Sequence, residues 1–422
     1  MEISAPNQRY QTDQFGKTSH KVAVAGHICL DIIPSFGSEK RDFENLLIPG
    51  KLIVVGQATI ASGGAVSNVG LALHRLGVPT VLIAKIGRDP FGDIIRDLLN
   101  HHSPELTKAM IVDEESSTSY TLVINPTDRD RMFLHSPGAN DEFKATDISD
   151  SDLDGVGLFH FGYPPLMRQM YRNNGEELEK LLAKVKGKGI ATSLDMAKPD
   201  PESEAGKVDW ISVLERILPY VDIFQPSLDE IFFMIDRERY DFFKTRYGED
   251  RYLKYINTDL LDQLSQTLIE MGAGVVVIKL GEQGLFLRTG ERVEALEGIL
   301  KRDAALPKWS KRQLLVPCFR ADVIGTTGSG DCAIAGFLAG MLDGADPIGA
   351  LTMAAGVGAF STEKPDATSG VEHKAAVQRR IASGWKHLKV CIEKTGWQWL
   401  DGESIWKGPM DEIETHRNII DL

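Results

Sequence analysis

The chain has 422 residues, of which 42% are hydrophobic and 25% are charged, a composition typical of a globular protein with enough apolar material for a core. Its formal net charge of −13 argues against nucleic acid or an anionic membrane surface as the main partner. No apolar run approaches the ~20 residues that span a bilayer. Residues 1–20 are polar and lack an apolar signal core, so we expect a cytoplasmic protein with a loose leader.

The first predicted strand is KVAVAGH, residues 21–27, a short apolar run of the kind found in buried parallel strands. Asp31 follows among apolar neighbours, where a carboxylate needs a partner or a polar ligand; an ordinary turn residue is the alternative. Two further β-rich segments, 46–62 and 119–137, stand outside any alternation of strands and helices. They predict a small sheet separate from the main one and suited to act as a lid.

Between these two segments lies GGAVSNVGLALHRLG, residues 63–77. Gly63 and Gly64 open a predicted helix of small residues, and Asn68 falls near its first turn. The glycine spacing is not Gly-x-Gly-x-x-Gly, so a dinucleotide site, and with it a dehydrogenase, fits poorly. Packing alone could account for the small residues, so a structural and a ligand-binding role both stay open at this point.

The middle of the chain alternates predicted strands and helices. Such a rhythm indicates a parallel sheet that is covered on both faces, with ligands gathering at the carboxyl ends of its strands. The strands are expected within 157–162, 190–197, 221–235 (which also starts a helix) and 275–281, with helices at 176–189 and 259–274.

Two short motifs fall at such strand ends. In QPSLDE, Ser227 and Glu230 stand three residues apart on the first turn of a helix, which a plain capping box would also explain. In KLGEQGLFL, which begins at Lys279, Gly281 and Gly284 are by themselves ordinary hairpin glycines.

The most informative stretch is GTTGSGDCAIAGFLAG, residues 325–340. Gly328, Ser329 and Gly330 form a turn that leads into Asp331 and an apolar helix, which is hydrophobic nearly all round and therefore expected to be buried. A helix start offers unpaired N–H groups and a partial positive charge, which suit a phosphate. A carboxylate beside a phosphate makes sense where it must take the proton of an attacking hydroxyl. An ordinary helix cap is the alternative.

Taken together, these motifs resemble the two signatures of the ribokinase-like (PfkB-type) carbohydrate kinases. The sequence Thr326-Thr327-Gly328-Ser329-Gly330-Asp331 is similar to the second signature, and Gly63-Gly64 with Asn68 to the first. The resemblance covers roughly residues 21 to 380. It implies an α/β fold with a central, mostly parallel sheet flanked by helices and a small β-sheet lid. It also implies ATP-dependent transfer of a phosphoryl group to a hydroxyl of a sugar or sugar-like molecule, with Mg²⁺.

The resemblance assigns roles residue by residue. Asp331 would be the catalytic base, and the amides of Gly328, Ser329 and Gly330 would stabilise the transferred phosphoryl group. The acceptor would be bound by Asp31, Gly63, Gly64, Asn68 and Asn140. The nucleotide would be bound by Ser227, Lys279, Gly281, Gly284 and Thr326, and Glu230 would help to hold Mg²⁺.

Two departures from the family pattern qualify these roles. Gly325 stands where the family has an Asp that contributes to a potassium site, so we expect weak or absent activation by monovalent cations unless Asp322 substitutes. Ser227 replaces an Asn of the family's Asn-x-x-Glu motif. These two departures leave open a catalytically silent sugar-binding protein of the same fold. A nucleoside kinase also stays open, because the family that the chain resembles includes both kinds of kinase.

The expected domain organisation has three parts: a leader at 1–20, a kinase domain at 21–384 and a Trp-rich C-terminal extension at 385–422. Within the kinase domain we expect lid segments at about 33–62 and 118–138, and inserts at about 236–258 and 298–318, the first of them a solvated helix. The extension carries four of the six tryptophans, so we expect it to pack on the body or on a partner subunit. A homodimer through the lid is a further expectation from the resemblance.

Overall fold

The computed structural model of the chain describes residues 21–36, 48–124, 132–248, 252–291, 293–300 and 303–412. The predicted leader, parts of both lid segments and of both inserts, and the last ten residues lie outside these ranges.

The centre of the molecule is a ten-stranded sheet with the strand order β15-β16-β14-β13-β12-β11-β10-β9-β1-β4. The six strands from β4 to β12 in this order run parallel, and the other four are antiparallel. The parallel strands are β4 (Thr80–Ile83), β1 (Lys21–Gly26), β9 (Val156–Gly162), β10 (Ala191–Leu194), β11 (Ile223–Phe224) and β12 (Val275–Lys279). The antiparallel strands are β13 (Leu285–Thr289), β14 (Gln313–Val316), β16 (Ile405–Lys407) and β15 (Gln398–Leu400). The predicted α/β class with a mostly parallel sheet is thus confirmed.

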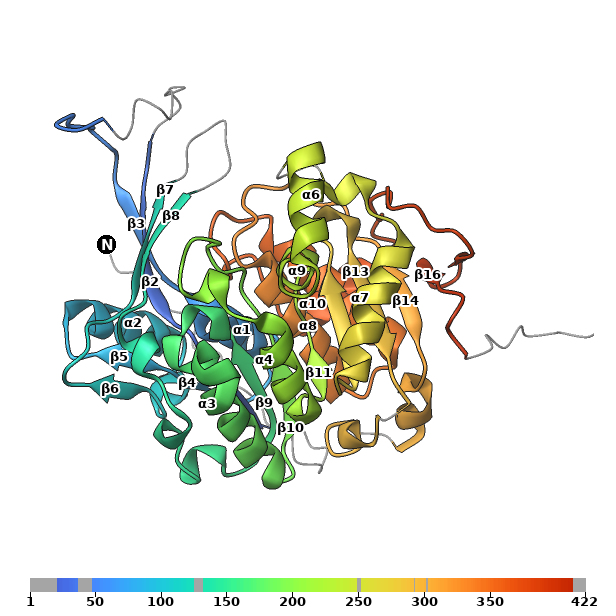
Figure 1. Cartoon of the computed structure of the whole chain (residues 1–422), viewed down its shortest axis with the longest axis horizontal. Helices are drawn as coiled ribbons and strands as arrows, with labels where there is room; N and C mark the ends of the chain where they lie inside the picture. The colour runs from blue at the N-terminus through green and yellow to red at the C-terminus, as the bar shows by residue number, and fades with distance from the viewer. Residues whose placement is uncertain are drawn as a thin grey trace, which may run out of the picture.

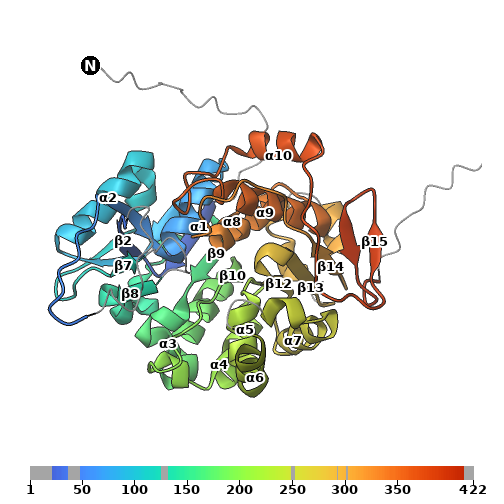
Figure 2. The same cartoon turned by 90° about the horizontal axis from the view of Figure 1, so that it is seen from above.

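Helices cover both faces of this sheet (Figures 1 and 2). Along β1, Val22 and Val24 belong to one buried apolar cluster and Ala23 and Ala25 to the other, which is why the strand reads as a continuous apolar run. One face carries α1 (Gly64–Arg75), α8 (Ser329–Leu342), α9 (Pro347–Ser361) and α10 (Lys374–Ala382). The other carries α3 (Arg168–Gly187), α4 (Trp210–Ile217), α5 (Leu228–Ile235), α6 (Arg237–Tyr247) and α7 (Thr258–Glu270).

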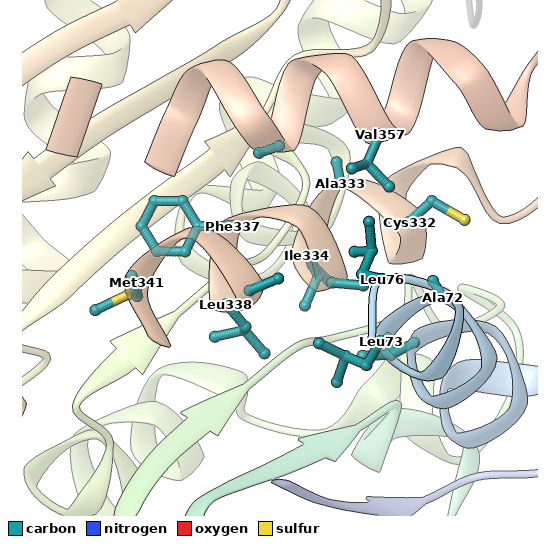
Figure 3. Close-up of a cluster of buried hydrophobic side chains, with 14 of the residues drawn as sticks. Ala72, Leu73, Leu76, Cys332, Ala333, Ile334, Phe337, Leu338, Met341 and Val357 are labelled. Carbon is teal, nitrogen blue, oxygen red and sulfur yellow. The ribbon is translucent and has the colours of Figure 1, made fainter. Parts of the chain in front are cut away.

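Helix α8 is buried from Asp331 to its last residue, as its apolar sequence predicts. Glycines let α9 approach it closely: a Cβ atom added to Gly336 would lie 2.9 Å from the Cα atom of Ala354. On its other side α8 packs against α1, and Figure 3 shows Leu73 of α1 and Leu76, the residue that follows the helix, beside α8. This apolar contact fixes the two helices against each other, and with them the polar residues at their N-terminal ends.

A separate four-stranded sheet, ordered β3-β2-β7-β8, projects from the body, as Figure 1 shows. Its strands are β2 (Cys29–Pro34), β3 (Ala58–Gly63), β7 (Tyr120–Ile124) and β8 (Met132–Ser136). The predicted separate sheet is therefore confirmed, but one boundary was wrong. Residues 48–57 form no strand despite their Ile and Val content; Leu52 and Val54 are exposed, and the amide of Gly56 donates to the carbonyl of Ser35 at 2.7 Å.

The two remaining segments lie against the body. The described part of the first insert contains α6, a largely solvent-facing helix in which Tyr240 is the buried residue and Phe242 is 61% exposed; Tyr240 and, beyond the helix, Tyr252 pack beside Phe232. The C-terminal extension adds β15 and β16 to the edge of the main sheet through pairing with β14. Trp385 stacks on Phe319 with a centroid distance of 4.6 Å. Within the described ranges, no helix has the length and apolar character needed to cross a membrane.

Candidate active site

The carboxyl ends of four adjacent parallel strands bring four polar side chains together. Tyr163 follows β9, Asp195 follows β10, Glu230 lies in the first turn of α5 after β11, and Lys279 ends β12. Parallel strands point their carboxyl ends to one edge of the sheet, so residues far apart in sequence converge there. Asp331, in the first turn of α8, faces the same edge through its bonds to Tyr163.

A cavity of about 440 Å³ lies between this edge and the small sheet. The small sheet contributes one wall, with Asp31, Thr121, Phe133 and His135 among its lining residues. The body contributes the opposite wall, which consists of His27, Gly64, Asn68, Tyr163, Lys198, Glu230, Thr326, Thr327, Gly328 and Asp331, among others. The predicted base and most of the predicted acceptor-binding residues therefore line one cleft.

Asp331 is 2% exposed, and side chains from two other elements bind its carboxylate. The amide of Asn68 donates to Oδ2 at 2.8 Å, and the hydroxyl of Tyr163 donates to Oδ1 and Oδ2 at 2.8 and 2.9 Å. Burial raises the pKa of Asp331, while Lys279 and the hydrogen bonds from Asn68 and Tyr163 act in the opposite direction. The Asn68 contact depends on the packing of α1 against α8.

Lys279 is the cation at the centre of a cluster of three carboxyl groups. Its Nζ atom lies 2.6 Å from Oδ1 of the fully buried Asp195. Burial lowers the pKa of Lys279, but the charges of Asp195, Glu230 and Asp331 outweigh that effect and raise it overall. A Cβ atom added to Gly330 would lie 3.9 Å from Nζ, so the ammonium group stands beside the start of α8. Positive charge and helix N–H groups are thus placed together, as an anion site requires.

Glu230 takes part in the capping box that the sequence offered as the alternative reading. Its carboxylate accepts from the Ser227 amide at 2.6 Å, and its own amide donates to the Ser227 hydroxyl at 3.3 Å. The same side chain nevertheless lines the cavity, so capping and ligand contact are compatible. Burial raises the pKa of Glu230 against the opposing effect of Lys279.

The donor set of this cluster fits Mg²⁺. Oδ2 of Asp195 is buried and has no hydrogen-bond partner among the described residues, and three carboxyl groups face one ammonium group. Within the described ranges, no three His, Cys, Asp or Glu side chains converge to form a closed metal cage. Mg²⁺ in kinase sites is commonly held by one or two carboxylates and by substrate phosphates, so a closed cage of protein ligands is not required.

The turn before α8 adopts the conformation that its glycines predict. Gly328 has a φ of 68°, and a Cβ atom added there would overlap the side chain of Ala367, so only glycine fits. The amide of Ser329 donates to the carbonyl of Thr326 at 3.3 Å, and that of Cys332 donates to the carbonyl of Gly328. One of the three amides assigned to the phosphoryl group is therefore engaged within the turn itself.

The predicted acceptor glycines lie directly against polar side chains. A Cβ atom on Gly63 would overlap the carboxylate of Asp31, and one on Gly64 would lie 2.6 Å from Nδ1 of His27. Burial raises the pKa of Asp31 to about 6, and hydrogen bonds from Cys29 and Thr121 oppose that effect. The absence of side chains at both glycines keeps Asp31 and His27 accessible to the cavity.

Several predicted site residues lie outside the cavity lining: Asn140, the two hairpin glycines, Gly63, Ser227, Lys279, Ser329 and Gly330. The Asn140 amide accepts from the Ile28 amide at 3.2 Å and donates to the Ile28 carbonyl at 2.8 Å, so its polar atoms hold the backbone before β2. Asn140 does not line the cavity. Gly281 and Gly284 form the turn after β12, two and five residues beyond Lys279, and they too lie outside its lining.

Sequence reasoning missed a polar chain along the acceptor wall. The Nε2 atoms of His27 and His135 lie 3.3 Å apart, and Nδ1 of His135 lies 3.0 Å from the Thr121 hydroxyl. That hydroxyl donates to Cys29 Sγ at 3.5 Å, and the Cys29 thiol donates to Asp31 at 3.3 Å. Asp195 was also missed. No spacing could have revealed these residues, because the pairings of separate strands bring them together.

A family model for pfkB family carbohydrate kinases matches residues 19–374. The chain belongs to this family. Both signature regions and all the cavity residues described above lie within the matched part, and the predicted family membership is confirmed.

Individual relatives are distant but cover most of the chain. An uncharacterized sugar kinase of Pyrococcus horikoshii is 25% identical over 314 residues, which are 73% of this chain and 82% of that one. Its crystal structure gives a TM-score of 0.60 and 21% identity, covering 85% of this chain and 97% of the other. The structure of a Xylella fastidiosa fructokinase with bound ATP gives 0.63 at 17% identity, with 87% and 99% covered. A ribokinase-II-type protein of Escherichia coli, solved with ATP and Mg²⁺, gives 0.62 at 19% identity, with 86% and 99% covered. These likenesses establish the ribokinase-like fold.

Proposed function

We propose that this PfkB-family kinase transfers the γ-phosphoryl group of ATP to a hydroxyl of an uncharged sugar, with Asp331 as the catalytic base. One observation carries the proposal: a buried carboxylate faces a cleft from the first turn of a helix whose start lies beside the Lys279 ammonium group. This places a proton acceptor next to an anion site, which is what phosphoryl transfer to an alcohol needs.

The charge of the cavity supports an uncharged acceptor. Asp31, Glu230 and Asp331 line it, and the described lining includes only one Lys or Arg, Lys198, which is paired with Asp229 at 2.8 Å. Burial lowers the pKa of both His27 and His135, so neither ring adds positive charge at neutral pH. A carboxylate or phosphate on the acceptor would meet repulsion here, whereas sugar hydroxyls find hydrogen-bonding partners along the whole wall.

On the phosphoryl side, Lys279 and the first amides of α8 would stabilise the charge on the transferred oxygens. Glu230 would hold Mg²⁺, which when bound neutralises phosphate charge. Ser227, Gly281, Gly284 and Thr326 would contact the nucleotide, as the family's pattern implies. Bound ATP in the Xylella fructokinase and ATP with Mg²⁺ in the E. coli protein support this assignment.

The reaction then follows from the positions of the side chains. The acceptor hydroxyl donates to Asp331, the new P–O bond forms as the bond to ADP breaks, and the proton passes to the carboxylate. Asn68 keeps Oδ2 in place during this step. The small sheet acts as a lid that excludes water, which would otherwise compete as the phosphoryl acceptor.

A nucleoside is the second candidate acceptor, favoured by one observation. Phe133 lines the cavity and is 52% exposed, so its ring offers a face on which a planar base could stack.

Apolar residues are also exposed elsewhere on the small sheet, with Ile60 at 41% and Leu134 at 48%. These residues support the proposal that two copies of the chain pair through this sheet.

The test is ATP consumption by the purified protein against sugars, sugar acids, sugar phosphates and nucleosides, with Asp331→Asn as the matched variant. We expect turnover with a neutral sugar and a loss of about a hundredfold to ten-thousandfold in kcat for the variant, the usual contribution of a general base. Turnover confined to nucleosides would move the assignment to the second candidate. Full turnover by Asp331→Asn would remove this residue from the mechanism. Acceptor binding without any turnover would indicate a silent sugar-binding protein.

A further inference from the structure

Tyr163 donates its hydroxyl to both carboxylate oxygens of Asp331. Its hydroxyl lies 2.8 and 2.9 Å from the two carboxylate oxygens, although the residues are 168 positions apart. Among the described residues, Tyr163 is the only donor to Oδ1, because Asn68 donates to Oδ2 alone. Burial, together with the charge of Asp331, raises the pKa of Tyr163 well above its usual range, so the hydroxyl keeps its proton and remains a donor.

The backbone at Tyr163 is held in a costly conformation. Its φ of 64° and ψ of 43° are left-handed, which is unusual for a residue with a side chain. The next residue is Pro164, and a residue before proline is normally extended. The carbonyl of Tyr163 accepts from the Leu166 amide at 3.0 Å, which closes the turn. Strain of this kind survives where the surroundings enforce it, and it is concentrated at functional sites.

The groups around Asp331 explain why such a donor is needed. Asp195 and Glu230 are acidic neighbours in the same cluster, and burial by itself favours the protonated form of Asp331. Lys279 supplies the only positive charge of the cluster within the described residues, and its closest bond is to Asp195 rather than to Asp331. His27, whose ring lies 6.0 Å from that of Tyr163, has a pKa lowered by burial and by His135, and it adds no charge.

We propose that Tyr163 is the positioning residue of the base: its strained turn aims the phenol at Asp331, orients the carboxylate and keeps it ready to accept the proton of the acceptor. The phenol lines the acceptor cavity, so the acceptor hydroxyl meets the carboxylate beside it, at Oδ1. This role rests on the proposed function, since it assumes that Asp331 acts as the base.

The first test is the pH dependence of kcat/KM in Tyr163→Phe. Loss of a hydrogen bond to a charged group should raise the pKa of Asp331, so the acidic limb should move up by about one pH unit. The matched control is Tyr171→Phe, which removes the hydroxyl of another largely buried tyrosine that packs beside Trp210 and lies outside the cavity lining. It should leave the profile unchanged. An unshifted limb in Tyr163→Phe would overturn the positioning role.

The second test needs no activity. Tyr163→Phe should lower the melting temperature of the native protein, because it removes a donor from a buried carboxylate. In an Asp331→Ala background the same change should have no such effect, and an equal loss in both backgrounds would show that the hydroxyl does not serve Asp331. If the change in melting temperature depends on Asp331 but the protein phosphorylates no acceptor, the proposed function is contradicted, while the hydrogen bond between Tyr163 and Asp331 is supported. Phosphorylation with an unshifted profile would contradict the positioning role alone.

Discussion

The two walls of the cavity are built on different principles. The body wall is organised by the start of α8 and by Lys279, where a turn of small residues presents backbone amides beside one ammonium group. The wall formed by the small sheet presents side chains only, joined by hydrogen bonds from His135 through Thr121 and Cys29 to Asp31. The first arrangement suits a phosphate group, which has the same shape and charge whatever the acceptor is. The second suits an acceptor that must be distinguished from other polyols.

The difference separates the part of the cavity that serves the phosphate from the part that contacts the acceptor. Backbone amides at a helix start depend on a few contiguous glycines, so that wall tolerates little change. A wall of side chains on strands can be altered one residue at a time, because each contact contributes separately to specificity. We therefore expect changes to the body wall to abolish the reaction, and changes to the small-sheet wall to alter acceptor binding.

The largest effect is expected from Lys279→Met on the body wall. It leaves the carboxyl group of Asp195 buried without its cation, which costs about 3–5 kcal/mol of stability, and it removes a charge that stabilises the transition state, for a loss of at least about a hundredfold in kcat. Adding Asp195→Asn should restore the melting temperature but not the activity. If Lys279→Met alone keeps the stability of the unchanged protein, the ion pair between Lys279 and Asp195 does not stabilise this wall.

A smaller and separable effect is expected from Asp31→Asn on the small-sheet wall. Burial raises the pKa of Asp31 to about 6, so its folded form binds a proton more readily than its unfolded form. Its ionisation therefore destabilises the fold as pH rises through about 6, and the variant should be more stable at pH 8, by up to about 3 kcal/mol.

The same variant should bind the acceptor less tightly, with KM raised about tenfold to a hundredfold and kcat changed less. In the unchanged protein, KM for the acceptor should rise as pH falls below about 6, because the protonated carboxyl group loses acceptor capacity. Urea unfolding at two pH values and steady-state kinetics measure the two effects. A large fall in kcat with an unchanged KM would place Asp31 in the chemical step and remove the distinction between the walls.

The smallest effect is expected from monovalent cations. Gly325 lacks a carboxylate, and a Cβ atom added there would lie 2.9 Å from the carbonyl oxygens of Lys364 and Pro365, so the loop is packed for glycine. Replacing sodium by potassium should change the rate by less than about twofold. A strong requirement for potassium would mean that other groups near the start of α8, such as Asp322, complete a cation site.

The sequence by itself determined the α/β class, the parallel core and the separate small sheet. It also predicted the buried helix after Asp331 and the glycine turn before it. These features depend on contiguous residues: apolar runs that suit buried strands, and glycines whose spacing defines a turn. The same local logic failed for residues 48–57, where Ile and Val content suggested a strand and the structure has none.

Only the tertiary structure decided which side chains meet. Strand order brings Tyr163, Asp195 and Lys279 to one edge, and the packing of α1 on α8 brings Asn68 to Asp331. The tertiary structure also shows that Asn140 hydrogen-bonds the backbone of Ile28, and that β15 and β16 extend the edge of the main sheet. The physical reason is that a hydrogen bond between side chains depends on distance in space, which periodicity and composition do not encode. Sequence alone therefore indicated the reaction, and the fold supplied the residues that control it.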